Sequence, residues 1–129
     1  MNILEVKDLC KTYIVNGRQN NVLKNVNFNI SEGEMVAIMG PSGSGKSTLL
    51  YATSGMDSVT SGKVNFNNKN IAKMKEKELS ELRLDEMGFI FQQMNMLKNL
   101  SIVDNIIFPA IQSKKNKECR KEILQRGYD

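Results

Sequence analysis

The stretch Gly40-Pro-Ser-Gly-Ser-Gly-Lys-Ser-Thr48 carries the most informative spacing in this 129-residue sequence. It satisfies the pattern G-x-x-x-x-G-K-[ST] with Gly40, Gly45, Lys46 and Ser47. Glycines let main-chain N–H groups turn inward around an anion, and a helix that begins there adds a favourable dipole. We therefore predict a phosphate-binding loop. Its binding residues would be Gly40, Pro41, Ser42, Gly43, Ser44, Gly45, Lys46, Ser47 and Thr48.

The segments on either side of the loop supply the context that such a loop needs. Residues 35–39 form a continuous apolar run, typical of a strand buried on both faces of a sheet. Residues 46–54 are good helix formers, and Gly55 is a plausible C-terminal stop. The sequence thus predicts a strand, a phosphate loop and a helix in succession.

The side chains of the loop predict a nucleoside triphosphate together with Mg²⁺. Lys46 would supply a positive charge to the β- and γ-phosphates, and the Ser47 hydroxyl would bind the Mg²⁺ that bridges them. Thr48 would add a hydroxyl near the α-phosphate. The alternative is a Gly/Ser-rich turn with a chance lysine, and such a match has a probability on the order of one in a few hundred at average glycine usage.

The rest of the chain predicts a mixed α/β domain. Strand-like alternation over residues 3–15 and 22–30, interrupted by a polar loop at 16–21, predicts antiparallel strands. A hairpin-like element is expected near 60–70, and a second buried strand over 87–91.

Helices are expected in three places after that hairpin. Charged residues 73–86 predict the first, and Ser101 with Asp104 resembles the start of the second. Pro109 should kink or end this second helix. Residues 113–126 predict a final amphipathic helix.

Bulk properties exclude several classes of protein. The formal net charge of +4 is small and dispersed, which argues against a nucleic-acid partner. No apolar run approaches the roughly 20 residues that a membrane span requires, so we expect a cytoplasmic chain that meets a membrane through a partner. Cys10 and Cys119 show no metal or redox spacing.

The loop, the following Leu49-Leu50, the turn Thr60-Ser61-Gly62 and the segment Met87-Gly-Phe-Ile-Phe-Gln-Gln93 together resemble the ABC ATPase family. The resemblance implies an α/β P-loop NTPase core with an antiparallel β-subdomain and the start of a helical subdomain, its sheet incomplete. It places the β-subdomain at 1–34, the core from the P-loop to the Q-loop at 35–93, and a partial helical subdomain at 94–129.

The resemblance also assigns roles to two residues outside the loop. Gln92, which matches the family's Q-loop, would reach the Mg²⁺ and the nucleophilic water, so that Ser47 and Gln92 are metal ligands and Lys46 and Gln92 are catalytic. Gln93 is the weaker candidate. Tyr13 would stack on adenine, although an exposed tyrosine on a strand is the ordinary alternative.

Within the family, residues 94–97 and the segment after them resemble small exporter-type subunits of lipoprotein, macrolide or peptide-antibiotic systems. This implies a transmembrane permease subunit or domain, a second ATPase domain, and a location on the inner face of the cell membrane. Met94, Met96 and Leu97 could receive a helix of the permease, but such residues are more often core.

Several of the family's hydrolytic motifs do not occur in these 129 residues. There is no Leu-Ser-Gly-Gly-Gln run, no apolar strand ending in Asp-Glu, and no histidine. The resemblance therefore covers an N-terminal half, which should bind MgATP without hydrolysing it and should expose apolar sheet edges. Two hypotheses remain, part of an ATP-hydrolysing transporter subunit or a nucleotide-binding module. A GTPase is disfavoured because Asn68-Lys69-Asn70-Ile71 fails the Asn-Lys-x-Asp pattern.

Overall fold

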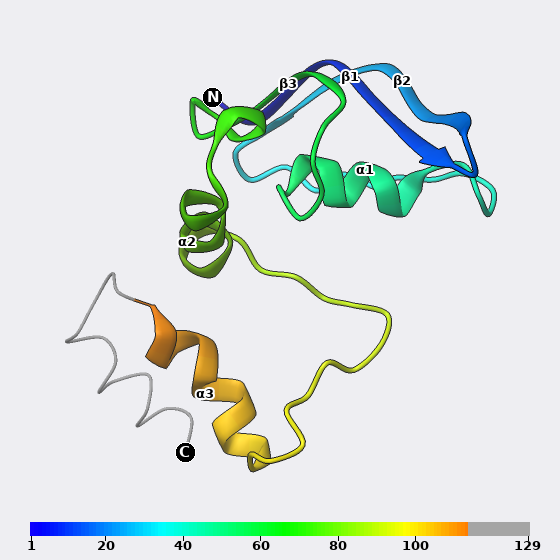
Figure 1. The fold of residues 1–129 in the computed structure, drawn as a ribbon. Helices are drawn as coiled ribbons and strands as arrows, with labels where there is room; N and C mark the ends of the chain where they lie inside the picture. The colour runs from blue at the N-terminus through cyan, green and yellow to red at the C-terminus, as the bar shows by residue number, and fades with distance from the viewer. Residues whose placement is uncertain (114–129) are drawn as a thin grey trace. The chain divides into compact units, whose positions relative to one another are not determined.

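The computed structural model describes residues 1–113, and the chain forms two compact units, Met1–Leu79 and Ser80–Asp129. Figure 1 shows the elements along the chain. They are β1 (Asn2–Val15), β2 (Arg18–Ser31), α1 (Lys46–Thr53), β3 (Ser61–Phe66), β4 (Lys69–Asn70), the short 3-10 helix η1 (Ile71–Lys73), α2 (Glu76–Glu86) and α3 (Ile102–Gln112). None of the helices in the described part is long and apolar enough to cross a membrane.

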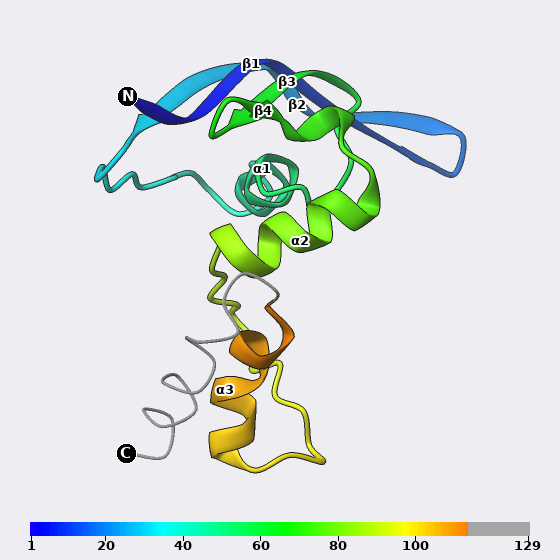
Figure 2. The same ribbon diagram turned by 90° about the vertical axis from the view of Figure 1, so that its left-hand side faces the viewer.

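The first unit is a two-layer arrangement of a sheet and a helix. Its four strands lie in the order β2-β1-β3-β4, and each neighbouring pair is antiparallel. Helix α1 lies along one face of this sheet, as both views show (Figures 1 and 2). The predicted antiparallel strands and the hairpin near residues 60–70 are confirmed.

The turn between β1 and β2 is shorter than the sequence suggested. Asn16 and Gly17 both have positive φ, 51° and 72°, and Val15 pairs directly with Arg18. Two such residues suit the right-handed twist of a tight hairpin. The predicted polar loop over 16–21 is therefore wrong, because residues 18–21 already belong to β2; their polar side chains reflect exposure, not irregular backbone.

The core of this unit lies between the sheet and α1. Val6 and Leu9 of β1 and Val64 of β3 are fully buried, and Val6 is paired with Val64 across the two strands. Ala52 contributes from α1. The sheet also needs a close approach at Gly62, since a Cβ there would lie 2.4 Å from the carbonyl oxygen of Asp8.

The two strands predicted from apolar runs do not form. Residues 35–39 and 87–91 have no regular structure, and Met35 is 97% exposed. A parallel strand buried on both faces requires neighbouring strands on its edges, and within residues 1–113 nothing pairs with either run. Both runs have the apolar composition of buried strands, but strand formation also requires neighbouring strands to pair with, which the composition of a run does not reveal.

The helix ends follow local signals more closely. Helix α1 ends at Thr53, and Gly55 follows with a φ of 76°, as expected of a helix stop. Helix α3 begins after Ser101, whose side chain accepts from the Asp104 amide at 3.1 Å.

Three helix predictions need correction or fall outside the described residues. Helix α2 starts at Glu76, later than the predicted 73, because η1 occupies residues 71–73. Pro109 does not end α3, which continues to Gln112 although this proline has no backbone N–H to donate; the kink, the other effect expected of Pro109, stays a prediction. The helix predicted at 113–126 lies almost wholly outside the described residues.

Replacing Leu9 by alanine should destabilise the chain far more than replacing Ile14, although both lie on β1. Leu9 is 0% exposed and Ile14 is 73% exposed. Leu9→Ala should lower the free energy of unfolding by about 2–5 kcal/mol, whereas Ile14→Ala should change it by less than about 0.5 kcal/mol. Urea unfolding followed by circular dichroism measures both, and equal losses would contradict the assigned core.

Candidate functional site

The predicted phosphate loop, residues 40–48, runs directly into the N-terminus of α1. Gly45 is the N-cap, with φ 96° in the left-handed region and without a side-chain cap. The Leu49 amide makes the first helical bond, to the Gly45 carbonyl at 2.9 Å. Within residues 1–113, the main-chain amides of Lys46, Ser47 and Thr48 have no main-chain acceptor. The helix thus begins with free donors, which is the arrangement that binds anions.

Glycine at position 45 is required by the neighbouring strand as well as by φ. A Cβ there would lie 3.0 Å from Cγ1 of Val22 and 3.4 Å from Cδ2 of Leu23, both on β2. The loop therefore packs closely against β2. The sheet in this way holds the start of α1 in place.

The ammonium of Lys46 folds back over its own loop. It donates to the carbonyl of Gly40 and, at 3.3 Å, to the carbonyl of Pro41. Both acceptors are neutral main-chain oxygens, so a charged phosphate oxygen would be a stronger acceptor for the same group.

An open cavity of about 380 Å³ lies over the loop. Its lining contains one cation and no carboxylate, and consists of Val22, Ser42, Gly43, Gly45, Lys46, Ser47 and Thr48. Together with the free amides, this lining makes the cavity electropositive, as an anion site requires. The structure thus brings together most of the predicted loop residues around one hollow.

Tyr13 lies on β1 and is held by a group that sequence reasoning missed. Its hydroxyl donates to Oδ2 of Asp57 at 2.6 Å, and the ammonium of Lys11 lies 4.9 Å from the centre of its ring. Lys11 also pairs with Oδ1 of Asp57 at 3.2 Å. No sequence motif links these residues, because Asp57 is separated from Tyr13 by 44 positions.

The hydrogen bond between Tyr13 and Asp57 shifts the pKa of both groups. It is the largest cause of a raised pKa at Tyr13, whose ordinary value is 10.0, with partial burial next; the neighbouring Thr48 side chain opposes the shift. At Asp57 the same bond lowers the pKa below 3.8, with Lys11 adding to it and burial opposing it. At neutral pH the tyrosine is therefore the donor and the carboxylate is charged.

Gln92 belongs to the second unit and lies in an exposed segment without regular structure. In the same segment the rings of Phe89 and Phe91 stack with their centres 6.0 Å apart. The roles predicted for Gln92 toward Mg²⁺ and water remain predictions. Among the described residues no cluster of three or more His, Cys, Asp or Glu side chains is arranged to hold a metal ion.

Comparison with known proteins identifies the family and the length of the match. Residues 23–127 match the model of the ABC transporter family. The solved dimeric structure of the ATP-binding cassette MJ0796 bound to ADP and Pi is similar with a TM-score of 0.87 and 38% identity, over 97% of this chain and 54% of that one. The predicted fold class is confirmed by this similarity.

Three curated relatives are similar at about the same level of identity. The chain is 41% identical to the lipoprotein-releasing system ATP-binding protein LolD of Wigglesworthia glossinidia brevipalpis, over 86% of this chain and 48% of the relative. It is 40% identical to the macrolide export ATP-binding/permease protein MacB of Mannheimia succiniciproducens, over 98% and 20%. It is 38% identical to the phosphonates import ATP-binding protein PhnC of Fusobacterium nucleatum, over 87% and 43%. The chain thus spans about half or less of these relatives.

Because Asp57 has a lowered pKa in the folded chain, its contribution to stability should depend on pH. A depressed carboxyl pKa stabilises the fold above the unfolded value, near 3.8, and this contribution is lost as pH falls through the lowered folded value. Asp57→Asn should therefore be less stable than the wild type at pH 7, with a difference that shrinks below about pH 4. Urea unfolding across that range checks this, and a difference independent of pH would refute it.

Proposed function

Because this chain belongs to the ABC transporter family, we propose that it binds MgATP through residues 40–48 and forms part of the ATP-binding component of a transporter. The observation that carries the proposal is the row of free main-chain amides at Lys46, Ser47 and Thr48, beside an ammonium and a cavity without carboxylates. Such a row favours a multiply charged anion.

The loop offers a triphosphate two kinds of interaction. Its amides donate without first breaking regular main-chain bonds, and Lys46 exchanges the neutral carbonyls of Gly40 and Pro41 for charged oxygens. Attraction between the ammonium and an oppositely charged phosphate oxygen is stronger than its attraction to a neutral carbonyl, so the exchange favours the bound state.

The metal would be held mainly by the nucleotide. Mg²⁺ prefers oxygen ligands and commonly takes substrate phosphates together with few protein groups. The exposed Ser47 hydroxyl stands at the start of α1 and suits this role, and Gln92 is the second proposed ligand. When bound, the ion would neutralise part of the negative charge of the phosphates. Lys46 and Ser47 would orient the phosphates.

The complete subunit would couple ATP binding and hydrolysis to export through a membrane partner. The names of LolD and MacB support an exporter, and the MacB name joins an ATP-binding part to a permease. The name of PhnC refers to import at a comparable identity, so the direction rests on the LolD and MacB names and the sequence of residues 94–97. The similar cassette MJ0796 is dimeric in its solved structure, which supports a second ATPase domain as partner. The site of action would be the inner face of the cell membrane.

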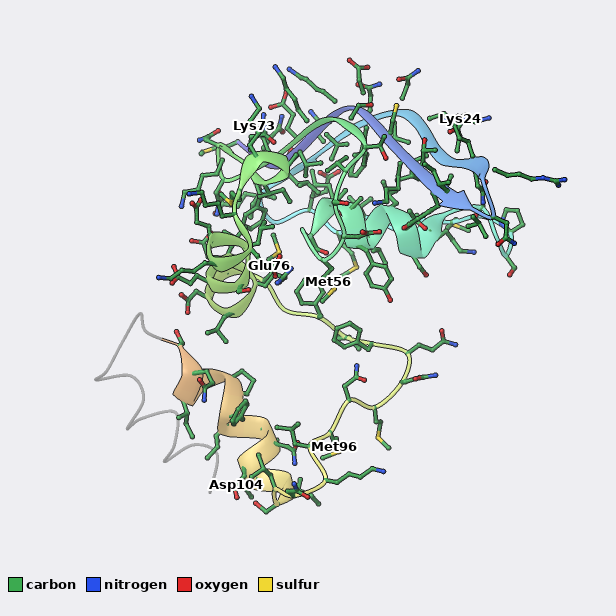
Figure 3. The ribbon with its side chains drawn as sticks, in the orientation of Figure 1. Lys24, Met56, Lys73, Glu76, Met96 and Asp104 are labelled. Atoms are coloured by element: carbon green, nitrogen blue, oxygen red, sulfur yellow. The ribbon has the colours of Figure 1, made fainter. Side chains whose placement is uncertain are left out.

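Replacing Lys46 by alanine should weaken MgATP binding by about 10- to 150-fold, because a charge-assisted hydrogen bond contributes about 1.5–3 kcal/mol. Titration calorimetry measures this. Lys24→Ala is the matched control, since Lys24 is exposed on β2, on the face of the sheet away from α1 (Figure 3). Equal affinities of wild type and Lys46→Ala would refute the proposed loop.

The 129-residue chain should release no measurable phosphate from MgATP at a concentration that saturates binding. Several hydrolytic groups of the family, including its histidine, do not occur in this sequence, so orientation of the attacking water would be incomplete. A phosphate-release assay on the preparation used for calorimetry tests this. Release that disappears in Lys46→Ala would show instead that these residues suffice for hydrolysis.

A further inference from the structure

Three side chains of the first unit form a closed group beside the proposed nucleotide site. The carboxylate of Asp57 uses one oxygen for the Tyr13 hydroxyl, at 2.6 Å, and the other for the Lys11 ammonium, at 3.2 Å. The same ammonium lies 4.9 Å from the Tyr13 ring centre. Each member thus contacts the other two, which restricts the rotation of the tyrosine ring.

Lys11 has little freedom to move away from this group. Its side chain is only 7% exposed, and its ammonium also donates to the Ser58 carbonyl at 2.5 Å and to the Ser58 hydroxyl at 3.3 Å. A buried ammonium with these acceptors is costly to displace. One face of the Tyr13 ring is therefore covered by a fixed cation, and a flat ligand can stack only on the other face.

The loop that carries Asp57 is tied to both β1 and α1. The Thr12 amide donates to the Thr60 hydroxyl at 2.9 Å, and the Thr60 amide donates to the Cys10 carbonyl at 3.0 Å. The Asp57 amide donates to the carbonyl of Tyr51 on α1 at 3.2 Å. The carboxylate that holds the tyrosine is thus fixed to the same helix whose N-terminus carries the phosphate loop.

We propose that Asp57 and Lys11 are positioning residues that hold the Tyr13 ring at a set place relative to residues 40–48, so that its uncovered face receives the base of a nucleotide. This rests on the proposed function, because it presumes a nucleotide in the loop. Holding the ring in its bound orientation before the ligand arrives lowers the cost of ordering it on binding.

The test compares two ligands that share phosphates but not a base. MgATP would use both the loop and the ring, whereas magnesium tripolyphosphate would use the loop alone. Tyr13→Ala should weaken MgATP binding about 5- to 150-fold, the range measured for one base stacked on an aromatic ring. It should leave tripolyphosphate binding unchanged.

The positioning role is isolated by variants that keep the ring. Tyr13→Phe and Asp57→Ala should each weaken MgATP binding about 2- to 12-fold, which corresponds to ordering one side chain. The double variant should lose no more than either single one, because both changes break the same bond. Tyr51→Phe is the matched control, since Tyr51 is 42% exposed on α1.

Calorimetry with both ligands on the full chain separates the outcomes. Selective loss of MgATP affinity with unchanged tripolyphosphate affinity supports the positioning role, and retained tripolyphosphate binding also shows that each variant is folded. Unchanged MgATP affinity in Tyr13→Phe and Asp57→Ala, or equal losses for both ligands, overturns it. A wild-type chain that binds neither ligand overturns the proposed function, and this inference with it.

Discussion

Every main-chain amide that leaves water must find an acceptor, and the arrangement of this chain follows from where its amides find one. In the sheet, β1 pairs with β2 along one edge and, over residues 4–10, with β3 along the other. At the start of α1, the first amides of the helix have no carbonyl in the preceding turn to bond to, and the left-handed N-cap Gly45 offers no side chain in its place. These unpaired donors are the ones that the proposed nucleotide would use, and the loop that carries them packs against β2.

The same rule accounts for the segments that remain irregular. Residues 35–39 have the composition of a central strand, yet Met35 is 97% exposed and no strand pairs with this run within residues 1–113. The matched cassette structure is nearly twice as long as this chain. A run that is apolar on both faces gains stability only between neighbouring strands. Without them it exposes apolar side chains and unpaired backbone groups that favour association with other chains.

Sequence reasoning succeeded where the structure is decided within a few residues. The helix that starts after Gly45, the helix stop at Gly55 and the cap at Ser101 are each decided by residues that lie next to the helix ends concerned. It failed where the outcome depends on distant partners. The strand at 35–39 needed other strands, and the bond between Tyr13 and Asp57 joins positions that no spacing rule connects. The run 35–39 showed strand composition but could not show whether a neighbour was present.

The group around Tyr13 shows why such distant contacts matter for a ligand that has two chemically different ends. A phosphate site built from main-chain amides is positioned by the helix that supplies them, whereas the ring proposed to meet the base lies on a separate strand. The two ends of a nucleotide are joined by a short, fairly rigid connection, so the helix and the strand must keep a fixed separation if both are to be used at once. The sheet alone does not fix the ring, because a tyrosine side chain can rotate about its own bonds. Asp57 removes that freedom through a loop that continues from α1, and Lys11 leaves one face of the ring accessible. In the proposed complex, the constraint that would align base and phosphate therefore passes through the segment after the helix as well as through the loop before it.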